Sequence, residues 1–144
     1  MTNLYLLGAP RADVPCVRNS CTVCCRDTNM PLTLADIERI TSLGYRLTEF
    51  SVEGADGSIR LRNREDHACF FLDARGRCSI HAAKPEGCRV YPFILDEEAD
   101  KVIRDDVCPY NEQFVAPADT ERKVRELVAR LEREADGRIH LSRR

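Results

Sequence analysis

Residues 16–25 read Cys-Val-Arg-Asn-Ser-Cys-Thr-Val-Cys-Cys and hold four of the eight cysteines in this 144-residue chain. The amino-terminal stretch lacks the basic and apolar segments of a secretory signal peptide, so we expect a cytoplasmic protein whose thiols stay reduced. In that compartment a dense group of cysteines is more typical of a metal site or a catalytic site than of disulfides. The candidate metal ligands are Cys16, Cys21, Cys24, Cys25, Cys69, Cys78, Cys88 and Cys108.

The adjacent pair Cys24 and Cys25 argues against a fully disulfide-bonded fold. Neighbouring Cα atoms lie about 3.8 Å apart, whereas a normal disulfide joins Cα atoms about 4.4–6.8 Å apart. In an extended segment the two side chains point to opposite sides of the chain. They could therefore serve two different centres, or one of them could be a bystander.

The spacing of the cysteines leaves the kind of metal open. Cys21-Thr-Val-Cys24 has the CxxC spacing of a zinc knuckle, but the later cysteines do not repeat it. Thiolates suit both tetrahedral zinc and iron–sulfur clusters. Because eight thiols exceed the need of one zinc site, we favour an iron–sulfur cluster of the [4Fe–4S] type, with zinc as the alternative. One centre with spare thiols and two four-thiolate centres both fit the count.

Four thiolates around either centre carry a net charge of about −2, which needs nearby cations or hydrogen-bond donors if the site is partly buried. Arg26, Arg77 and Arg89 each follow or precede a cysteine and are candidates, with Arg89 the first. His81 lies between Cys78 and Cys88 and could be a ligand, although a structural role is the simpler expectation.

The remaining histidines carry no such signal. We expect His67 on the surface and His140 in the carboxy-terminal tail. No glycine-rich phosphate loop, G-x-S-x-G elbow or H-E-x-x-H pair is present in the sequence. The sequence therefore names no catalytic residue outside the cysteines, and it leaves open whether the protein is an enzyme.

A helix is predicted over residues 33–43, where apolar residues recur at helical spacing. Thr33 can cap its start together with Asp36, and Gly44 follows its end. A longer amphipathic helix is predicted over residues 119–136.

That second helix is expected to end at Gly137 and to be followed by a flexible tail, residues 138–144. No repeat or composition change divides the chain. We therefore expect one domain over residues 1–144, with a cysteine-bearing core over 16–110.

Short strands with turn residues between them are predicted in the rest of the chain. Residues 45–63 form an expected strand pair, with Phe50 in the first strand, and residues 69–80 form an expected second hairpin. A turn or short helical piece then leads to an extended segment over 89–93, and residues 101–104 can form one more strand. The expected fold is a small single α+β domain with short antiparallel hairpins, a central helix, a carboxy-terminal helix and cysteine-bearing loops around a metal centre.

Charge and hydropathy limit the partners. Twenty-two Lys and Arg against 24 Asp and Glu give a net charge of −2, without the basic surplus of a dedicated nucleic-acid binder. No apolar run approaches the roughly 20 residues that a membrane helix needs. We expect the partner to be a metal ion or cluster, with no nucleic acid and no membrane, and a protein partner stays open.

The ordered set of motifs resembles the YkgJ-type cysteine-cluster family of zinc- or iron-chelating domains. The resemblance rests on the eight cysteines and on Lys84-Pro-Glu-Gly-Cys88-Arg-Val-Tyr-Pro-Phe93, and it covers roughly residues 16–110. It implies that all eight cysteines belong to a metal or iron–sulfur site. It also implies that Pro85, Arg89, Tyr91 and Pro92 are signature positions, whereas Lys84 and His81 depart from the residues common there.

The cysteine cluster also resembles that of flagellin lysine N-methylase, a larger protein. Three functions therefore stand beside one another: a structural or electron-transfer metal-binding module, a cluster-dependent enzyme resembling a protein-lysine methyltransferase, and a thiol redox sensor. We expect the first, because the methylase resemblance lies in the cysteines alone and this chain is compact.

Overall fold

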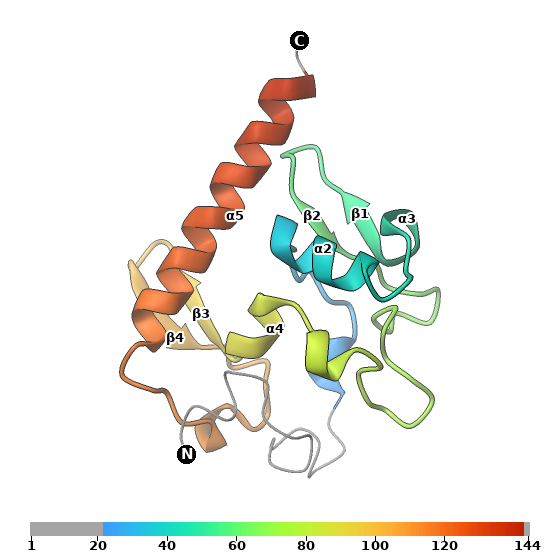
Figure 1. Ribbon diagram of the computed structural model, residues 1–144. Helices are drawn as coiled ribbons and strands as arrows, with labels where there is room; N and C mark the ends of the chain where they lie inside the picture. The colour runs from blue at the N-terminus through green and yellow to red at the C-terminus, as the bar shows by residue number, and fades with distance from the viewer. Residues whose placement is uncertain (1–21, 143–144) are drawn as a thin grey trace.

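The computed structural model describes residues 22–142, so Cys16 and Cys21 lie outside the described residues. Four α-helices and two short antiparallel hairpins make this part of the chain a small α+β domain, as predicted (Figure 1). The elements are η3 (Val23–Cys25), α2 (Leu34–Thr41), α3 (Leu47–Phe50), β1 (Ser51–Glu53), β2 (Ile59–Leu61), η4 (His81–Ala83), α4 (Glu86–Val90), β3 (Phe93–Asp96), β4 (Lys101–Arg104), η5 (Asn111–Gln113) and α5 (Thr120–Ser142).

Helix α2 begins where its sequence predicts, with a complete capping box. The Thr33 side chain accepts a hydrogen bond from the Asp36 amide at 3.0 Å, and the Asp36 carboxylate accepts one from the Thr33 amide at 3.0 Å. These bonds satisfy two amides that the first helical turn leaves without partners. Gly44 follows the helix with φ +104°, a left-handed conformation that favours glycine.

The first predicted strand pair is confirmed in β1 and β2, which pair antiparallel with Ser51 opposite Leu61. Phe50, expected in the first strand, instead ends the short helix α3. Its side chain is fully buried, and the ring centroid lies 5.7 Å from that of Phe71. The alternation of apolar and polar residues from Phe50 to Val52 therefore spans the boundary between α3 and β1 instead of lying within one strand.

The hairpin expected over residues 69–80 is present only as a loop with one isolated bridge, between Leu72 and Cys78. The turn between them is as predicted, because the Gly76 amide donates to the Asp73 carbonyl at 3.0 Å. Cys69 at the start of this loop is buried and Cys78 near its end is partly buried, and neither lies in a strand. The second hairpin is formed by β3 and β4, so the strand expected over 101–104 is confirmed.

The extended segment expected from residue 89 begins later, since Arg89 and Val90 lie in α4. The chain becomes extended at Tyr91, the residue that precedes Pro92, as the steric effect of a proline on its predecessor requires.

Helix α5 is longer than the predicted 119–136, since it continues through Gly137 to Ser142. Residues 138–142, expected as tail, are therefore helical. The Arg138 side chain donates to the Gly57 carbonyl in the β1–β2 turn, and Ile139 lies close to the same glycine. These contacts with the β1–β2 turn stabilise the last turns of α5, so the helix continues past Gly137, although glycine often ends a helix.

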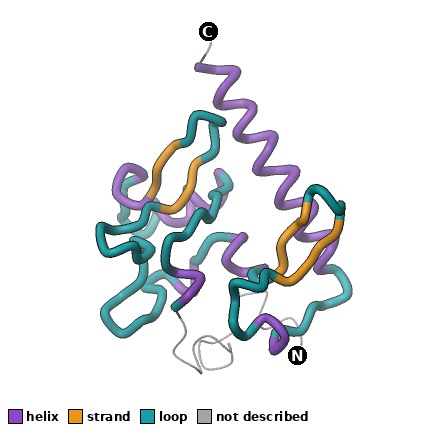
Figure 2. The backbone as a smooth tube through the Cα atoms, turned by 180° about the vertical axis from the view of Figure 1, so that it is seen from behind, coloured by secondary structure: helices purple, strands orange, loops and turns teal. Residues whose placement is uncertain are grey.

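Two core clusters divide the molecule. The first contains Leu32, Ile40, Phe50, Ile59, Leu61, Ala68, Cys69, Phe71, Leu72 and Ile80, and the second contains Phe93, Cys108, Phe114 and Val124. Figure 2 shows the two hairpins on opposite sides of the molecule, with α5 running past both. The β3–β4 hairpin packs on the first half of α5, whereas the β1–β2 turn meets its carboxy-terminal part.

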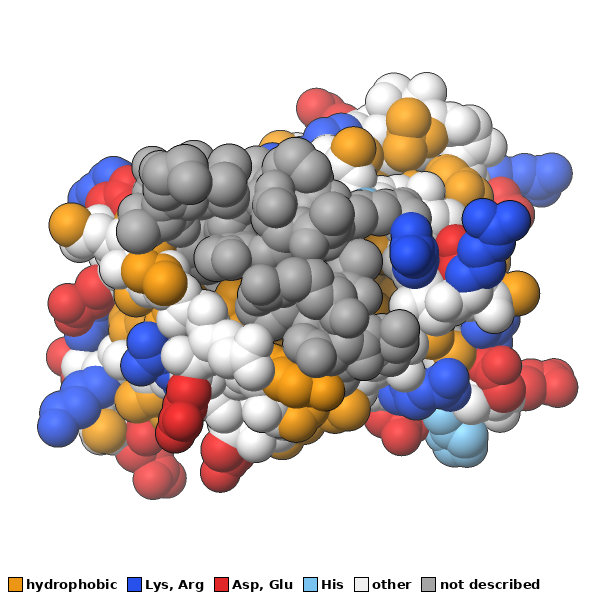
Figure 3. All heavy atoms as spheres, turned by 90° about the horizontal axis from the view of Figure 1, so that it is seen from below, with side chains coloured by type: hydrophobic (Ala, Val, Ile, Leu, Met, Phe, Trp, Pro, Cys, Tyr) orange, Lys and Arg blue, Asp and Glu red, His pale blue; other side chains and the backbone are white. Residues whose placement is uncertain are grey.

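Lys, Arg, Asp and Glu side chains of both signs lie around the edge of the face shown in Figure 3, with apolar side chains between them. Neither sign dominates there, in line with the net charge of −2. Within residues 22–142, no helix combines the length and the apolar character that crossing a membrane requires.

Candidate metal centre

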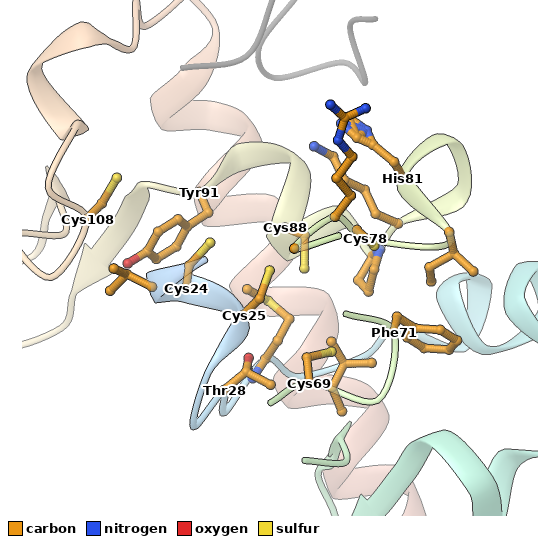
Figure 4. Close-up of a pocket in the computed structure, with 18 of the residues that line it drawn as sticks. Cys24, Cys25, Thr28, Cys69, Phe71, Cys78, His81, Cys88, Tyr91 and Cys108 are labelled. Atoms are coloured by element: carbon orange, nitrogen blue, oxygen red, sulfur yellow. The ribbon is translucent and has the colours of Figure 1, made fainter. Parts of the chain in front are cut away.

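All six cysteines of the described residues line one pocket between the two core clusters. They come from segments far apart in the sequence: η3, the loop from Cys69 to Cys78, helix α4 and the loop at Cys108 (Figure 4). The rest of the wall is mainly apolar and includes Met30, Phe71, Ile80 and Pro85. The fold thus gathers thiols in a partly apolar setting.

Five of these thiols form a connected group. The Cys24 and Cys25 side chains are hydrogen-bonded to each other, and Cys88 lies within electrostatic range of Cys24, Cys69 and Cys78. In Figure 4 the sulfurs of Cys24, Cys25 and Cys88 face the same space. We call Cys24, Cys25, Cys69, Cys78 and Cys88 the thiol group.

Cys108 lies apart from the thiol group, in the second core cluster. The Tyr91 ring stands between Cys108 and Cys24 in Figure 4, and its hydroxyl donates to Asp105 at 2.6 Å. Tyr91 is electrostatically coupled to both cysteines, and its pKa is raised by burial and by the Asp105 carboxylate. The phenol therefore stays neutral at physiological pH, and its ring lies between Cys108 and Cys24 in this view of the shared pocket.

Three members of the thiol group, Cys24, Cys69 and Cys88, lie in surroundings that favour the protonated form. The pKa of Cys24 is raised chiefly by the hydrogen bond to Cys25, whereas burial raises the pKa values of Cys69 and Cys88. The nearby Lys84 ammonium opposes this shift at Cys24 and Cys88. A metal ion that binds here must therefore displace protons from the sulfurs.

The pocket is not arranged as a finished coordination sphere. Among residues 22–142, no three His, Cys, Asp or Glu side chains are placed to hold one metal ion. Cys24, Cys25, Cys69 and Cys88 carry free thiols. The sulfurs share a cavity, and ligation would need side chains to turn toward a common point. The predicted ligands Cys16 and Cys21 lie outside the described residues.

The cations near the pocket are partly those expected. Arg77, one of the expected cations, lines the pocket together with Lys84, which was not among them. Arg89, the first candidate, donates instead to the carbonyls of Lys84 and Ala82, at 3.2 and 3.1 Å. Arg26 donates to the Thr22 hydroxyl at 3.2 Å. Lys84 lies on the short connection between η4 and α4, four residues before Cys88.

The histidines also differ in their places. His81 is buried and lines the pocket, which keeps it close to the cysteines. His67 lies on the surface, as expected, with Nδ1 2.8 Å from an Asp27 carboxylate oxygen. His140 lies near the carboxy-terminal end of α5, inside a helix instead of the expected tail.

Backbone hydrogen bonds hold the Cys69 loop, which has little regular secondary structure. The Cys69 amide donates to the Cys25 carbonyl at 2.6 Å, joining two cysteine-bearing segments. The Arg64 guanidinium donates to the carbonyls of Cys69 and Leu72, at 3.2 and 2.6 Å. The part of the pocket wall at Cys69 is thus held by hydrogen bonds of its backbone, some of them to the Arg64 side chain.

A small α+β domain whose loops bring cysteines to one pocket belongs to the class of cysteine-rich metal-binding domains. The chain belongs to the CxxCxxCC family, described as a "Putative zinc- or iron-chelating domain", which matches residues 15–109. The predicted family is thereby confirmed, and with it metal binding in general. No curated protein and no solved structure matched the chain significantly.

Proposed function

We propose that this protein is a cytoplasmic metal-binding module that holds an iron–sulfur cluster through its pocket thiols. The observation that carries the proposal is that six cysteines from distant segments line one pocket. The thiol group supplies the nearest ligands, joined by Cys16 and Cys21 from the adjoining sequence. Cys108, the eighth expected ligand, is the weakest candidate because Tyr91 stands between it and Cys24.

Thiolates are the donors that both iron–sulfur clusters and structural zinc use. We place the cluster first, because the five sulfurs of the thiol group already exceed the four of one zinc site. The Lys84 ammonium and the Arg77 guanidinium line the same pocket and offset the negative charge of bound thiolates. The metal ties together loops that have few other regular contacts, so its role is first structural.

The test is to purify the full chain anaerobically and to measure iron, zinc and acid-labile sulfide per chain, together with the visible absorption spectrum. Iron and sulfide with broad visible absorption support the cluster. Stoichiometric zinc in a colourless protein keeps the metal module and replaces the cluster by zinc. A protein that acquires neither metal on reconstitution with iron and sulfide, or with zinc, contradicts the proposal.

Two matched cysteine variants locate the centre. Cys88→Ser removes a sulfur from the middle of the thiol group, whereas Cys108→Ser makes the same change beyond Tyr91. We expect the Cys88 variant to lose most of its metal and the Cys108 variant to keep most of it. The reverse order would place the centre on the other side of Tyr91.

A further inference from the structure

The segment from His81 to Val90 brings the Lys84 ammonium and the Cys88 thiol to the pocket, along with the His81 side chain. It consists of the one-turn helix η4, a short connection and the five-residue helix α4. Such short elements do not hold their own geometry in water. Contacts from elsewhere in the fold must therefore fix the path of this segment.

Asp36 in helix α2 supplies the first of these contacts. Its side chain is fully buried, and its two carboxylate oxygens have different partners. Oδ2 completes the capping box with the Thr33 amide, whereas Oδ1 accepts the Glu86 amide at 3.0 Å and the Arg39 guanidinium at 2.7 Å. Oδ2 thus caps the start of α2, whereas Oδ1 links Arg39 of α2 to the start of α4.

Arg39, one turn further along α2, supplies the second contact. Its Nε donates to the Ala83 carbonyl at 3.2 Å, and its terminal nitrogen donates to the Lys84 carbonyl at 3.0 Å as well as to Asp36. The planar guanidinium can satisfy several acceptors in a fixed geometry, which a lysine ammonium cannot reproduce. Three consecutive peptide units before α4 are therefore tied to one side chain pair.

The same segment is held from its other side. Arg89 donates to the Lys84 carbonyl at 3.2 Å, so that two arginines share this acceptor. Glu86 forms an ion pair of 2.6 Å with Arg130, which joins α4 to α5. Among the charged groups that hold this segment, the Asp36 carboxylate is fully buried. Its electrostatic interactions are therefore screened least by solvent.

We propose that Asp36 and Arg39 are positioning residues for the metal centre, acting through the backbone of residues 83–86 to place Lys84 and Cys88. The inference rests on the proposed function, since it assumes that Cys88 is a ligand. Neither side chain lines the thiol pocket in the described part of the chain. Their effect on the metal is therefore indirect, like that of the outer groups that orient ligands at other metal sites.

The test compares Arg39→Met and Arg39→Lys with the control Arg104→Met. Arg104 also donates to a backbone carbonyl, that of Phe114 at 3.2 Å, but in the second core cluster. Two readouts are used on the full chain: the rate of metal loss to a chromogenic chelator, and hydrogen exchange of the peptide that spans residues 81–90. Exchange is measured with and without metal, so this readout does not depend on loading.

We expect Arg39→Met to lose metal roughly 10- to 100-fold faster than the wild type and to exchange faster at residues 81–90. Arg39→Lys should show the same changes to a smaller extent, because it keeps a charge beside Asp36 but not the forked donors. It also decides the question if the methionine variant does not fold. Arg104→Met should change neither readout.

Wild-type rates of metal loss and of exchange in both Arg39 variants would overturn the inference and leave the proposed function intact. A general loss of stability, with exchange raised equally in β3 and β4, would assign Arg39 a merely structural role and would also overturn it. A wild-type protein that takes up no metal would instead refute the proposed function, an outcome that is separate because it appears before any variant is compared.

Discussion

The two core clusters of this molecule are built differently, although both contain cysteine. The second cluster is a hairpin packed on a long helix, with Phe93 and Val124 almost fully buried between them. The first cluster joins one helix and a small hairpin to long loops, and it packs against Cys25, Cys78 and Cys88. The β3–β4 ladder runs through the second cluster, whereas the first has the shorter β1–β2 ladder and arginine side chains that hold the backbone of its loops.

The two clusters should therefore depend on a metal to different degrees. A hairpin on an amphipathic helix satisfies its own backbone and buries its own apolar face. The loop that contains Cys69 and the short helix α4 that contains Cys88 cannot satisfy their own backbone or bury an apolar face without the rest of the fold. If the thiols bind a metal, the first cluster gains from it most, and perturbations should act unequally on the two halves.

Removing the metal should give the largest effect. Structural zinc contributes on the order of 10 kcal/mol to folding, which is comparable with the whole stability of about 5–15 kcal/mol for a typical domain. We expect a verified metal-free sample to lose protection from hydrogen exchange throughout the first cluster, with β3, β4 and α5 less affected. Circular dichroism and exchange identical to those of the loaded protein would show that the fold does not depend on a metal.

Truncating a buried aromatic ring should come next. Phe50→Ala should lower the free energy of unfolding by about 3–5 kcal/mol, because its ring is fully buried against Phe71. Phe93→Ala is the matched change in the second cluster, where Phe93 is 4% exposed and does not line the cysteine pocket. Denaturant unfolding of the loaded protein measures both. We expect metal loss to accelerate only in the Phe50 variant; equal acceleration in the Phe93 variant would contradict the division into two halves.

Acidification should weaken metal binding gradually. The pKa values of Cys24, Cys69 and Cys88 are raised, so these sulfurs carry protons near neutral pH until a metal displaces them. Lower pH adds protons that compete with the metal, and affinity should fall by roughly tenfold per pH unit for each proton displaced. Competition titrations at several pH values, with proton release followed in weak buffer, check this. An affinity independent of pH would argue against thiol ligands.

The smallest effect concerns the ion pair that joins α4 to α5. Arg130 and Glu86 are each 36% exposed and 2.6 Å apart. Exposed pairs of this kind contribute about 0–1 kcal/mol, so Arg130→Met should change stability by less than about 1 kcal/mol. Thermal unfolding at low and high salt measures it. A loss as large as that of Phe50→Ala would mean that this pair, and not the packing of each half, joins the two regions.

The sequence was most informative where a pattern is local. The capping box of Thr33 and Asp36 predicted the start of α2, and the alternation at Ile59 and Leu61 predicted β2. Both predictions depend on residues that are close to one another in the sequence, so a short stretch of sequence is enough to make them. The gathering of cysteines was predicted from their number and the family resemblance.

What the sequence could not reveal depends on contacts between distant segments. The extension of α5 past Gly137 follows from Arg138 meeting Gly57, 81 residues earlier. The second oxygen of Asp36 meets Glu86 across 50 residues, and no local spacing indicates that pair. The position of Cys108 behind Tyr91 likewise needed the folded chain.

X-ray absorption spectroscopy at the metal edge of the anaerobically purified protein decides whether these thiols hold the metal. We expect sulfur atoms as the nearest neighbours of the metal, at about 2.3 Å if it is zinc, with fewer of them in Cys88→Ser and the same number in Cys108→Ser. A first shell made only of nitrogen or oxygen, at about 2.0–2.2 Å for zinc, would contradict the claim that these thiols hold the metal.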